Sequence, residues 1–140
     1  MQLSTTVRNS ILDSIDDDLN GGTTPEARFF VNGGATPTSE AAAILLNATN
    51  VFNAATTGTM AINTATTLED TTPAGNASPV TRLCFYADTT DADNAWLLQL
   101  GINPTGSPDI TMANNTIATT DTVQLTSLTL TCPTGTPDVT

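Results

Sequence analysis

Short apolar stretches separated by turn residues dominate the chain after residue 25. The stretches are rich in Thr, Val and Ile, whose β-branched side chains favour extended backbone, and clusters of Gly, Pro, Asn and Asp separate them. Strands are therefore expected over residues 27–32, 43–51, 59–65, 80–88, 95–102, 109–113 and 122–132. Because no helices alternate with these strands, the pattern predicts a mainly β fold, either an antiparallel β-sandwich or a jelly-roll-like barrel.

One α-helix is predicted before the strands, over residues 5–19. The hydroxyl residues before it can cap its first turn, and Asn20 with the two glycines that follow can end it. In between, apolar side chains recur at helical spacing at Val7, Ile11, Leu12, Ile15 and Leu19. We therefore divide the chain into an N-terminal helix and arm, residues 1–22, and a β-sandwich domain, residues 23–140.

The alternation of side chains along the expected strands predicts which residues face the core. Neighbouring strand residues point to opposite faces of a sheet, so Phe29 and Phe30 must separate. One of them is expected in the core, and the other beneath the N-terminal helix or a partner. In the last strand the apolar phase shifts near Thr126 and Ser127, which predicts a β-bulge or a bend between sheets. In the strand over residues 80–88, the side chains expected to face inward are Leu83, Phe85 and Ala87. Cys84 and Tyr86 are expected on the opposite face.

Two local features admit alternatives. Residues 41–46 can start a helix in place of a strand, because three alanines follow Ser39 and Glu40. Cys84 and Cys132 both lie in expected strands, which permits a disulfide between them. Free thiols are favoured, because a disulfide is rare in a cytoplasmic product.

The charge balance excludes several classes of partner. Acidic residues outnumber basic ones by 14 to 3, there is no histidine, and the formal net charge is -11. Nucleic acids and anionic membranes are bound by clustered Lys and Arg, and this sequence has no such cluster. The first residues lack a basic segment followed by an apolar one, and no apolar run reaches the ~20 residues that cross a bilayer. We therefore expect a soluble product of a cytoplasm with no nucleic-acid or membrane partner.

The residue types also argue against catalysis. Ser-His-Asp and Cys-His sites both need a histidine, which this sequence lacks. Two carboxylates can hydrolyse glycosides, but Glu26, Glu40 and Glu69 lie in turn-rich segments with nothing to bring them together. The sequence therefore predicts that the chain is not an enzyme.

The end of the predicted helix resembles part of a calcium site. Asp16, Asp18, Asn20 and Gly21 match the first half of the EF-hand loop. The second half fails, because the position of the final glutamate is Ala27. We expect a polar helix end here, and the alternative is a weak calcium site held by Asp16, Asp18 and Asn20. No other cofactor is predicted.

A second acidic cluster lies between two expected strands, at Asp88, Asp91 and Asp93. Such loops are usually solvated turns fixed by hydrogen bonds from the Asp side chains to the backbone. Calcium coordination is again the alternative.

Three segments resemble a group of small bacteriophage virion structural proteins: MQLSTTVRNSILDSI, RLCFYADTTD and DITMANNTIATTDTVQLTSLTLT. In that group a helix reading like VRNxxLDxI precedes a β-sandwich, and a strand like FRIYDS takes the place of LCFYAD. The loop over residues 65–78 departs from the group. The resemblance implies a virion component made in the host cytoplasm, with no chemistry of its own.

The resemblance implies three placements for such a protein. The favoured one is a capsid decoration (cement) protein that binds the major capsid protein on the outer shell. The alternatives are a tail, neck or fibre component and a host-surface binding module. A homo-oligomer within the particle is expected. Fold analogy of this kind indicates function only weakly.

The contact surface is expected on the exposed side of the N-terminal helix together with Arg8, Arg28 and Arg82. These are the only cations that can pair with carboxylates of a neighbouring protein. The alternative is that each arginine neutralises an internal carboxylate, as Asp13 or Asp16 could do for Arg8.

Overall fold

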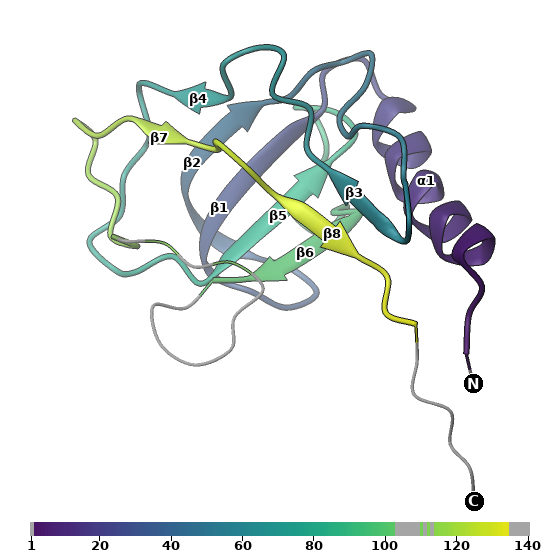
Figure 1. Ribbon diagram of the computed structural model, residues 1–140. Helices are drawn as coiled ribbons and strands as arrows, with labels where there is room; N and C mark the ends of the chain where they lie inside the picture. Colours follow the sequence, from purple (N-terminus) through teal and green to yellow (C-terminus); the bar gives the residue numbers. More distant parts are fainter. Residues whose placement is uncertain (1, 103–109, 111, 113, 135–140) are drawn as a thin grey trace, which may run out of the picture.

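The computed structural model describes residues 2–102, 110, 112 and 114–134. Helix α1 (Thr5–Asn20) comes first, with Ser4 capping it by accepting the Val7 N–H at 3.3 Å. The strands that follow are β1 (Glu26–Asn32), β2 (Thr38–Leu45), β3 (Thr59–Ala61), β4 (Glu69–Asp70), β5 (Arg82–Tyr86), β6 (Leu98–Gly101), β7 (Val123–Gln124) and β8 (Thr129–Thr131). The predicted mainly β fold with one N-terminal helix is confirmed (Figure 1).

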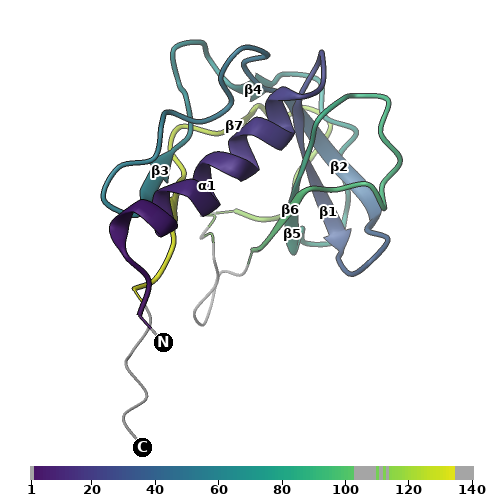
Figure 2. The ribbon, with the colours of Figure 1, turned by 90° about the vertical axis from the view of Figure 1, so that its right-hand side faces the viewer.

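Three antiparallel sheets make up the β structure. Four strands form the largest sheet in the order β2-β1-β5-β6, and two small sheets pair β3 with β8 and β4 with β7. The small sheets lie over one face of the large one (Figure 1). Figure 2 shows α1 running across the side that faces the viewer, from β3 toward the start of β1. The pairing closes no barrel among the described strands.

The main core joins the helix to the sheets. Leu12 and Leu19 of α1 belong to the same buried cluster as Phe29, Phe52 and Phe85. The rings of Phe52 and Phe85 lie 5.8 Å apart, a usual distance for a tilted aromatic pair. The helix is thus part of the packed core, so residues 23–140 bury much less apolar surface without it.

The outer face of the large sheet carries a second, smaller cluster. Phe30, Cys84 and Tyr86 are buried there, and Trp96 packs against them. The opposite facing of Phe29 and Phe30 is therefore confirmed, as is the pairing of Cys84 with Tyr86 on the outer face. The expectation that the helix covers this second face is wrong, because Trp96 packs there and Phe30 is fully buried within the chain.

Strand β2 begins and ends earlier than the sequence predicts. It spans Thr38–Leu45 in place of residues 43–51, and it pairs with β1 along its length. The helix considered over residues 41–46 is not formed. Ala41, Ala42 and Ile44 are buried, and partnership with β1 overrides the local helix propensity of the alanines.

The last predicted strand is divided, as its phase shift indicates. Its first part, β7, pairs with β4, and its second part, β8, pairs with β3. Strand β4 was not predicted, since its two residues are both acidic. The expected strand over residues 109–113 lies largely outside the described residues. No helix in the described part of the chain is long and apolar enough to span a membrane.

The outer cluster gives a test of the fold. Phe30→Ala removes a fully buried ring between Cys84, Tyr86 and Trp96, so it should lower the free energy of unfolding by about 3–5 kcal/mol. Leu97→Ala changes a side chain that is 42% exposed and should stay within about 0.5 kcal/mol of the wild type. Urea unfolding measures both, and equal losses would contradict the outer cluster.

Candidate functional site

The polar face of α1 binds the backbone of residues 51–58 through four side-chain oxygens. Each accepts one backbone N–H: Asn9 from Gly58 at 2.8 Å, Asp13 from Ala55 at 2.9 Å, Asp16 from Phe52 at 2.8 Å and Asn20 from Val51 at 3.1 Å. We call these four bonds the helix ladder. Spacings of four, three and four residues place the acceptors on one side of a helix. The ladder thus satisfies backbone groups of a segment that lies mostly outside the strands.

The helix ladder also accounts for the residues of the calcium hypothesis. One oxygen of Asp16 is bound to the Phe52 amide, and the other accepts the Asn20 side-chain amide at 2.9 Å. Asp18 is exposed and takes no part in the ladder. The structure therefore does not bring Asp16, Asp18 and Asn20 together around a cation. Among the described residues no group of three or more potential metal ligands of the His, Cys, Asp and Glu types is found.

Burial affects the ladder carboxylate of Asp16. Loss of solvent raises its pKa above the ordinary value, and the hydrogen bonds from Phe52 and Asn20 oppose that rise. The two hydrogen bonds therefore favour the charged form of the Asp16 carboxylate, which burial disfavours.

Arg8 lies beside the helix ladder but has few partners. Its guanidinium donates to the Cys132 carbonyl and to the Thr5 hydroxyl, each at 3.3 Å. It passes close over Gly58, where a Cβ atom would lie 2.1 Å from Nη1, and Gly58 has φ of +80°. Its Nε is buried without a hydrogen-bond partner in the described structure, and no described carboxylate forms an ion pair with it. The internal pairing considered with Asp13 or Asp16 is not formed.

Arg28 is buried on the outer face of the large sheet, with only 6% of its surface exposed. It forms an ion pair with Glu26 and another with Asp93 at 3.2 Å, and it lies 4.2 Å from the centre of the Tyr86 ring. It also donates to the carbonyls of Thr89 and Asp91, each at 2.9 Å. Arg28 therefore anchors the loop over residues 88–97, and its burial removes it from the predicted contact surface.

Tyr86 belongs to the same cluster. Its hydroxyl donates to the Asp93 carbonyl at 3.0 Å, and burial raises its pKa. Burial likewise raises the pKa of the nearby Glu40 carboxyl, although the positive charge of Arg28 opposes this. The cluster thus fastens one loop to the sheet.

Asp88 holds the start of this loop to the segment before β1. Its carboxylate accepts the hydroxyls of Thr23 at 2.8 Å and Thr24 at 2.9 Å, and the backbone N–H of Thr90 at 3.2 Å. Asp91 in turn accepts the Asp88 N–H at 3.0 Å. The cluster of Asp88, Asp91 and Asp93 is therefore a turn fixed by Asp side chains, as the sequence predicts, with Asp93 engaged by Arg28.

Arg82, the third cation, is only partly exposed. Its guanidinium donates to the neighbouring Thr81 carbonyl at 2.7 Å and passes close to Gly33. No carboxylate in the described part of the chain forms an ion pair with it. Its assignment to a partner contact stays a prediction.

Both cysteines are free, as the sequence favours. Cys84 is buried in the outer cluster, and burial raises the pKa of its thiol. Cys132 is half-buried at the end of β8. The thiols lie on different parts of the fold, so the structure forms no disulfide between them.

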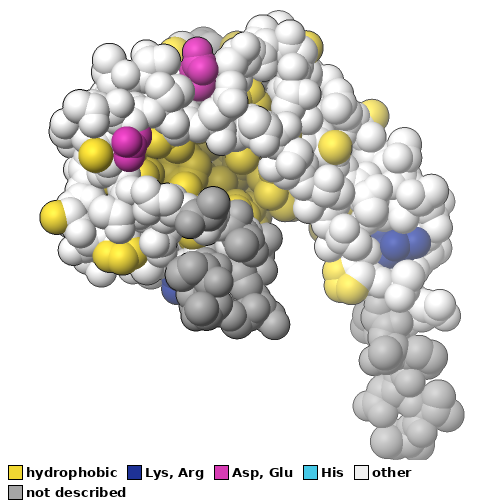
Figure 3. Space-filling model, turned by 60° about the vertical axis from the view of Figure 1, so that its left-hand side comes forward, with side chains coloured by type: hydrophobic (Ala, Val, Ile, Leu, Met, Phe, Trp, Pro, Cys, Tyr) yellow, Lys and Arg dark blue, Asp and Glu magenta, His cyan; other side chains and the backbone are white. Residues whose placement is uncertain are grey.

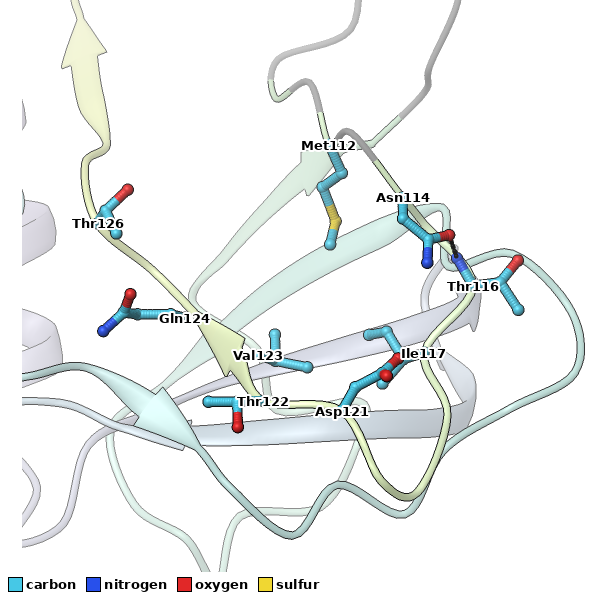
Figure 4. A pocket seen from close by; sticks show the side chains of 9 residues that line it. All are labelled: Met112, Asn114, Thr116, Ile117, Asp121, Thr122, Val123, Gln124 and Thr126. Atoms are coloured by element: carbon cyan, nitrogen blue, oxygen red, sulfur yellow. Dashed lines mark hydrogen bonds between the residues drawn. The ribbon is translucent and has the colours of Figure 1, made fainter.

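Among the hollows on the described surface, two lie beside the small sheets and are lined partly by apolar side chains. One, of about 530 Å³, is lined by Met112, Ile117 and Val123 among polar side chains, and Figure 4 shows these three around the opening. The other is an apolar groove of about 360 Å³ between α1, β6 and β8. Its lining includes Ile11, Ile15, Leu98, Leu100, Leu128 and Leu130, and we call it the helix groove. Uncharged polar groups and backbone cover most of the face in Figure 3, which is hollowed over hydrophobic side chains.

Comparisons of the chain with models of protein families, with curated proteins and with solved structures give no match. A functional assignment therefore depends on the chain itself, on its charge, its contacts and its exposed apolar surface.

The helix ladder predicts unequal effects for two substitutions of one residue. Asp13→Ala leaves the Ala55 amide without its acceptor, which should cost about 1–3 kcal/mol of unfolding free energy. Asp13→Asn keeps an oxygen at the same place and should cost clearly less. Asp17→Ala, at an exposed position of the same helix, should stay within about 0.5 kcal/mol. Urea unfolding compares the three, and equal effects of Asp13→Ala and Asp13→Asn would contradict the ladder.

Asp88 predicts a dependence of stability on pH. Hydrogen bonds from Thr23, Thr90 and Thr24 lower its pKa below the ordinary value of 3.8. Its carboxylate therefore stabilises the fold above pH 3.8, and the contribution is lost as the pH falls toward the lowered pKa. Asp88→Asn should lower the melting temperature at neutral pH, and the difference from wild type should shrink in acid. A difference that stays constant from pH 7 to pH 2 would refute this role.

Proposed function

We propose that this chain is a structural protein of a bacteriophage particle, namely a capsid decoration protein bound to the outside of the shell. The observation that carries the proposal is the helix groove, a hollow between α1, β6 and β8 in which apolar side chains and no charged residue form the lining. A partner protein could cover such an uncharged hollow together with the exposed Ile11 at its edge. The resemblance of the helix and of two strand segments to small virion proteins supplies the setting.

The polar clusters are consistent with a structural role. The helix ladder, the Arg28 cluster and the Asp88 turn direct their charged groups at the protein's own backbone and side chains. Groups held in this way rigidify a fold, and a repeated particle component benefits from rigidity and from acidic, soluble monomers before assembly. The proposal therefore assigns no chemistry to the chain.

The charge also suggests the nature of the shell surface. With a net charge of -11, the chain associates most readily with a basic patch on the major capsid protein, because complementary potentials speed and orient association. Arg8 and Arg82 are the cations left for carboxylates of that partner, since Arg28 is buried.

Copy number in purified particles tests the proposal. A decoration protein should be present in numbers comparable to the major capsid protein, because it repeats with the shell lattice. Quantitative mass spectrometry of particles from the source phage gives that ratio. A ratio far below one would favour a tail or neck component, and absence from the particles would refute a virion role altogether.

A further inference from the structure

The sequence contains two asparagines that are followed directly by glycine, Asn20 before Gly21 and Asn32 before Gly33. Asparagine side-chain amides are thermolabile, because the backbone nitrogen of the next residue can attack the amide carbon and release ammonia. Glycine permits this attack best, since it has no Cβ to hinder the approach or to restrict the backbone. The two pairs are therefore equivalent in the sequence, and only their surroundings in the fold can make them differ.

Asn20 is held on both sides of its carboxamide. Its Oδ1 accepts the Val51 N–H at 3.1 Å, and its Nδ2 donates to the Asp16 carboxylate at 2.9 Å. The attacking nitrogen is held as well, because the Gly21 N–H donates to the Asp18 carbonyl at 3.3 Å. The end of α1 must open before Asn20 can react.

Asn32 is held much less firmly. It is the exposed last residue of β1, and its Nδ2 donates to the Thr38 hydroxyl at 3.2 Å. Within the described part of the chain, no hydrogen bond to its Oδ1 or from the Gly33 N–H is found. Gly33 itself lies outside the strands. The carbon that is attacked and the nitrogen that attacks are thus both free to approach each other.

Arg82 adds a positive charge at this point. Its side chain passes so close to Gly33 that a Cβ atom there would lie 2.4 Å from Cγ and 2.5 Å from Nε of the arginine. No carboxylate among the described residues forms an ion pair with it. A nearby cation favours loss of a proton from the Gly33 nitrogen and stabilises the negative oxygen that forms when the amide carbon is attacked.

We propose that Asn32 is a site of spontaneous deamidation, promoted by Arg82. The Gly33 nitrogen gives its proton to hydroxide and forms a bond to Cγ of Asn32. The bond from Cγ to Nδ2 then breaks, and Nδ2 leaves as ammonia with a proton from water. Water opens the cyclic imide at either carbonyl, which leaves an aspartate or an isoaspartate at position 32.

The modification places a carboxylate beside Arg82. One negative charge is added to the chain, and Arg82 gains an acidic partner, so it is no longer a free cation for a neighbouring protein. An isoaspartate also adds an atom to the main chain, at a position where β1 pairs with Thr38 of β2. The inference goes beyond the proposed function and does not depend on it.

Peptide mapping by mass spectrometry during storage at neutral pH tests the site, with Asn20 as the internal control. In the folded protein, Asn32 should lose its amide at least about tenfold faster than Asn20, because the Asn20 site must first open locally. In guanidinium chloride, where neither site is held, the two should react at similar rates. A folded protein in which Asn20 reacts as fast as Asn32 would overturn the proposal, as would an Asn32 that stays intact while Asn20 is modified.

Two substitutions of Arg82 test its part in the reaction. Arg82→Gln removes the charge and should slow the loss at Asn32 about fivefold, the effect of one unit charge a few ångströms away in a largely aqueous setting. Arg82→Lys keeps the charge and should retain most of the rate. Circular dichroism and thermal melting establish that both variants are folded. A rate that Arg82→Gln leaves unchanged or raises would refute the role of Arg82.

Discussion

The hydrogen bonds between α1 and residues 51–58 determine most of what surrounds them. They set the rotation of the helix, which places Leu12 and Leu19 in the core and leaves Ile11 outside. They also give acceptors to a segment with few strand partners, so that β3 can begin at Thr59 and pair with β8. The helix is therefore held by hydrogen bonds on one side and by apolar packing of Leu12 and Leu19 on the adjacent side.

Acidic side chains also hold other segments of the fold in place through hydrogen bonds and ion pairs. Asp88 and Asp93 tie the loop over residues 88–97 to the segment before β1 and to Arg28. Charged hydrogen bonds of this sort are stronger than neutral ones, so loops can be held without a disulfide or a metal. Some of the acidic residues that give the sequence its negative charge therefore make internal contacts in the fold.

The sequence predicted the features that depend on local pattern. Helix α1, the two faces of β5 and the bend between β7 and β8 all follow from spacing and phase. Features that depend on tertiary partners were missed, including the early start of β2 and the cover over Phe30. The spacing of the ladder residues was visible in the sequence, but Asp16 and Asn20 were interpreted as half of a calcium loop, because their backbone donors lie more than thirty residues away.

Native-state hydrogen exchange tests the central role of the helix ladder most directly. The backbone amides of Phe52, Ala55 and Gly58 lie at the edges of regular structure or outside it, yet each donates to a side chain of α1. The account predicts that these amides exchange as slowly as those of β1 and β5, because they open only when the helix leaves the core. Exchange at the rate of the exposed loop amides, while β1 and β5 stay protected, would contradict it.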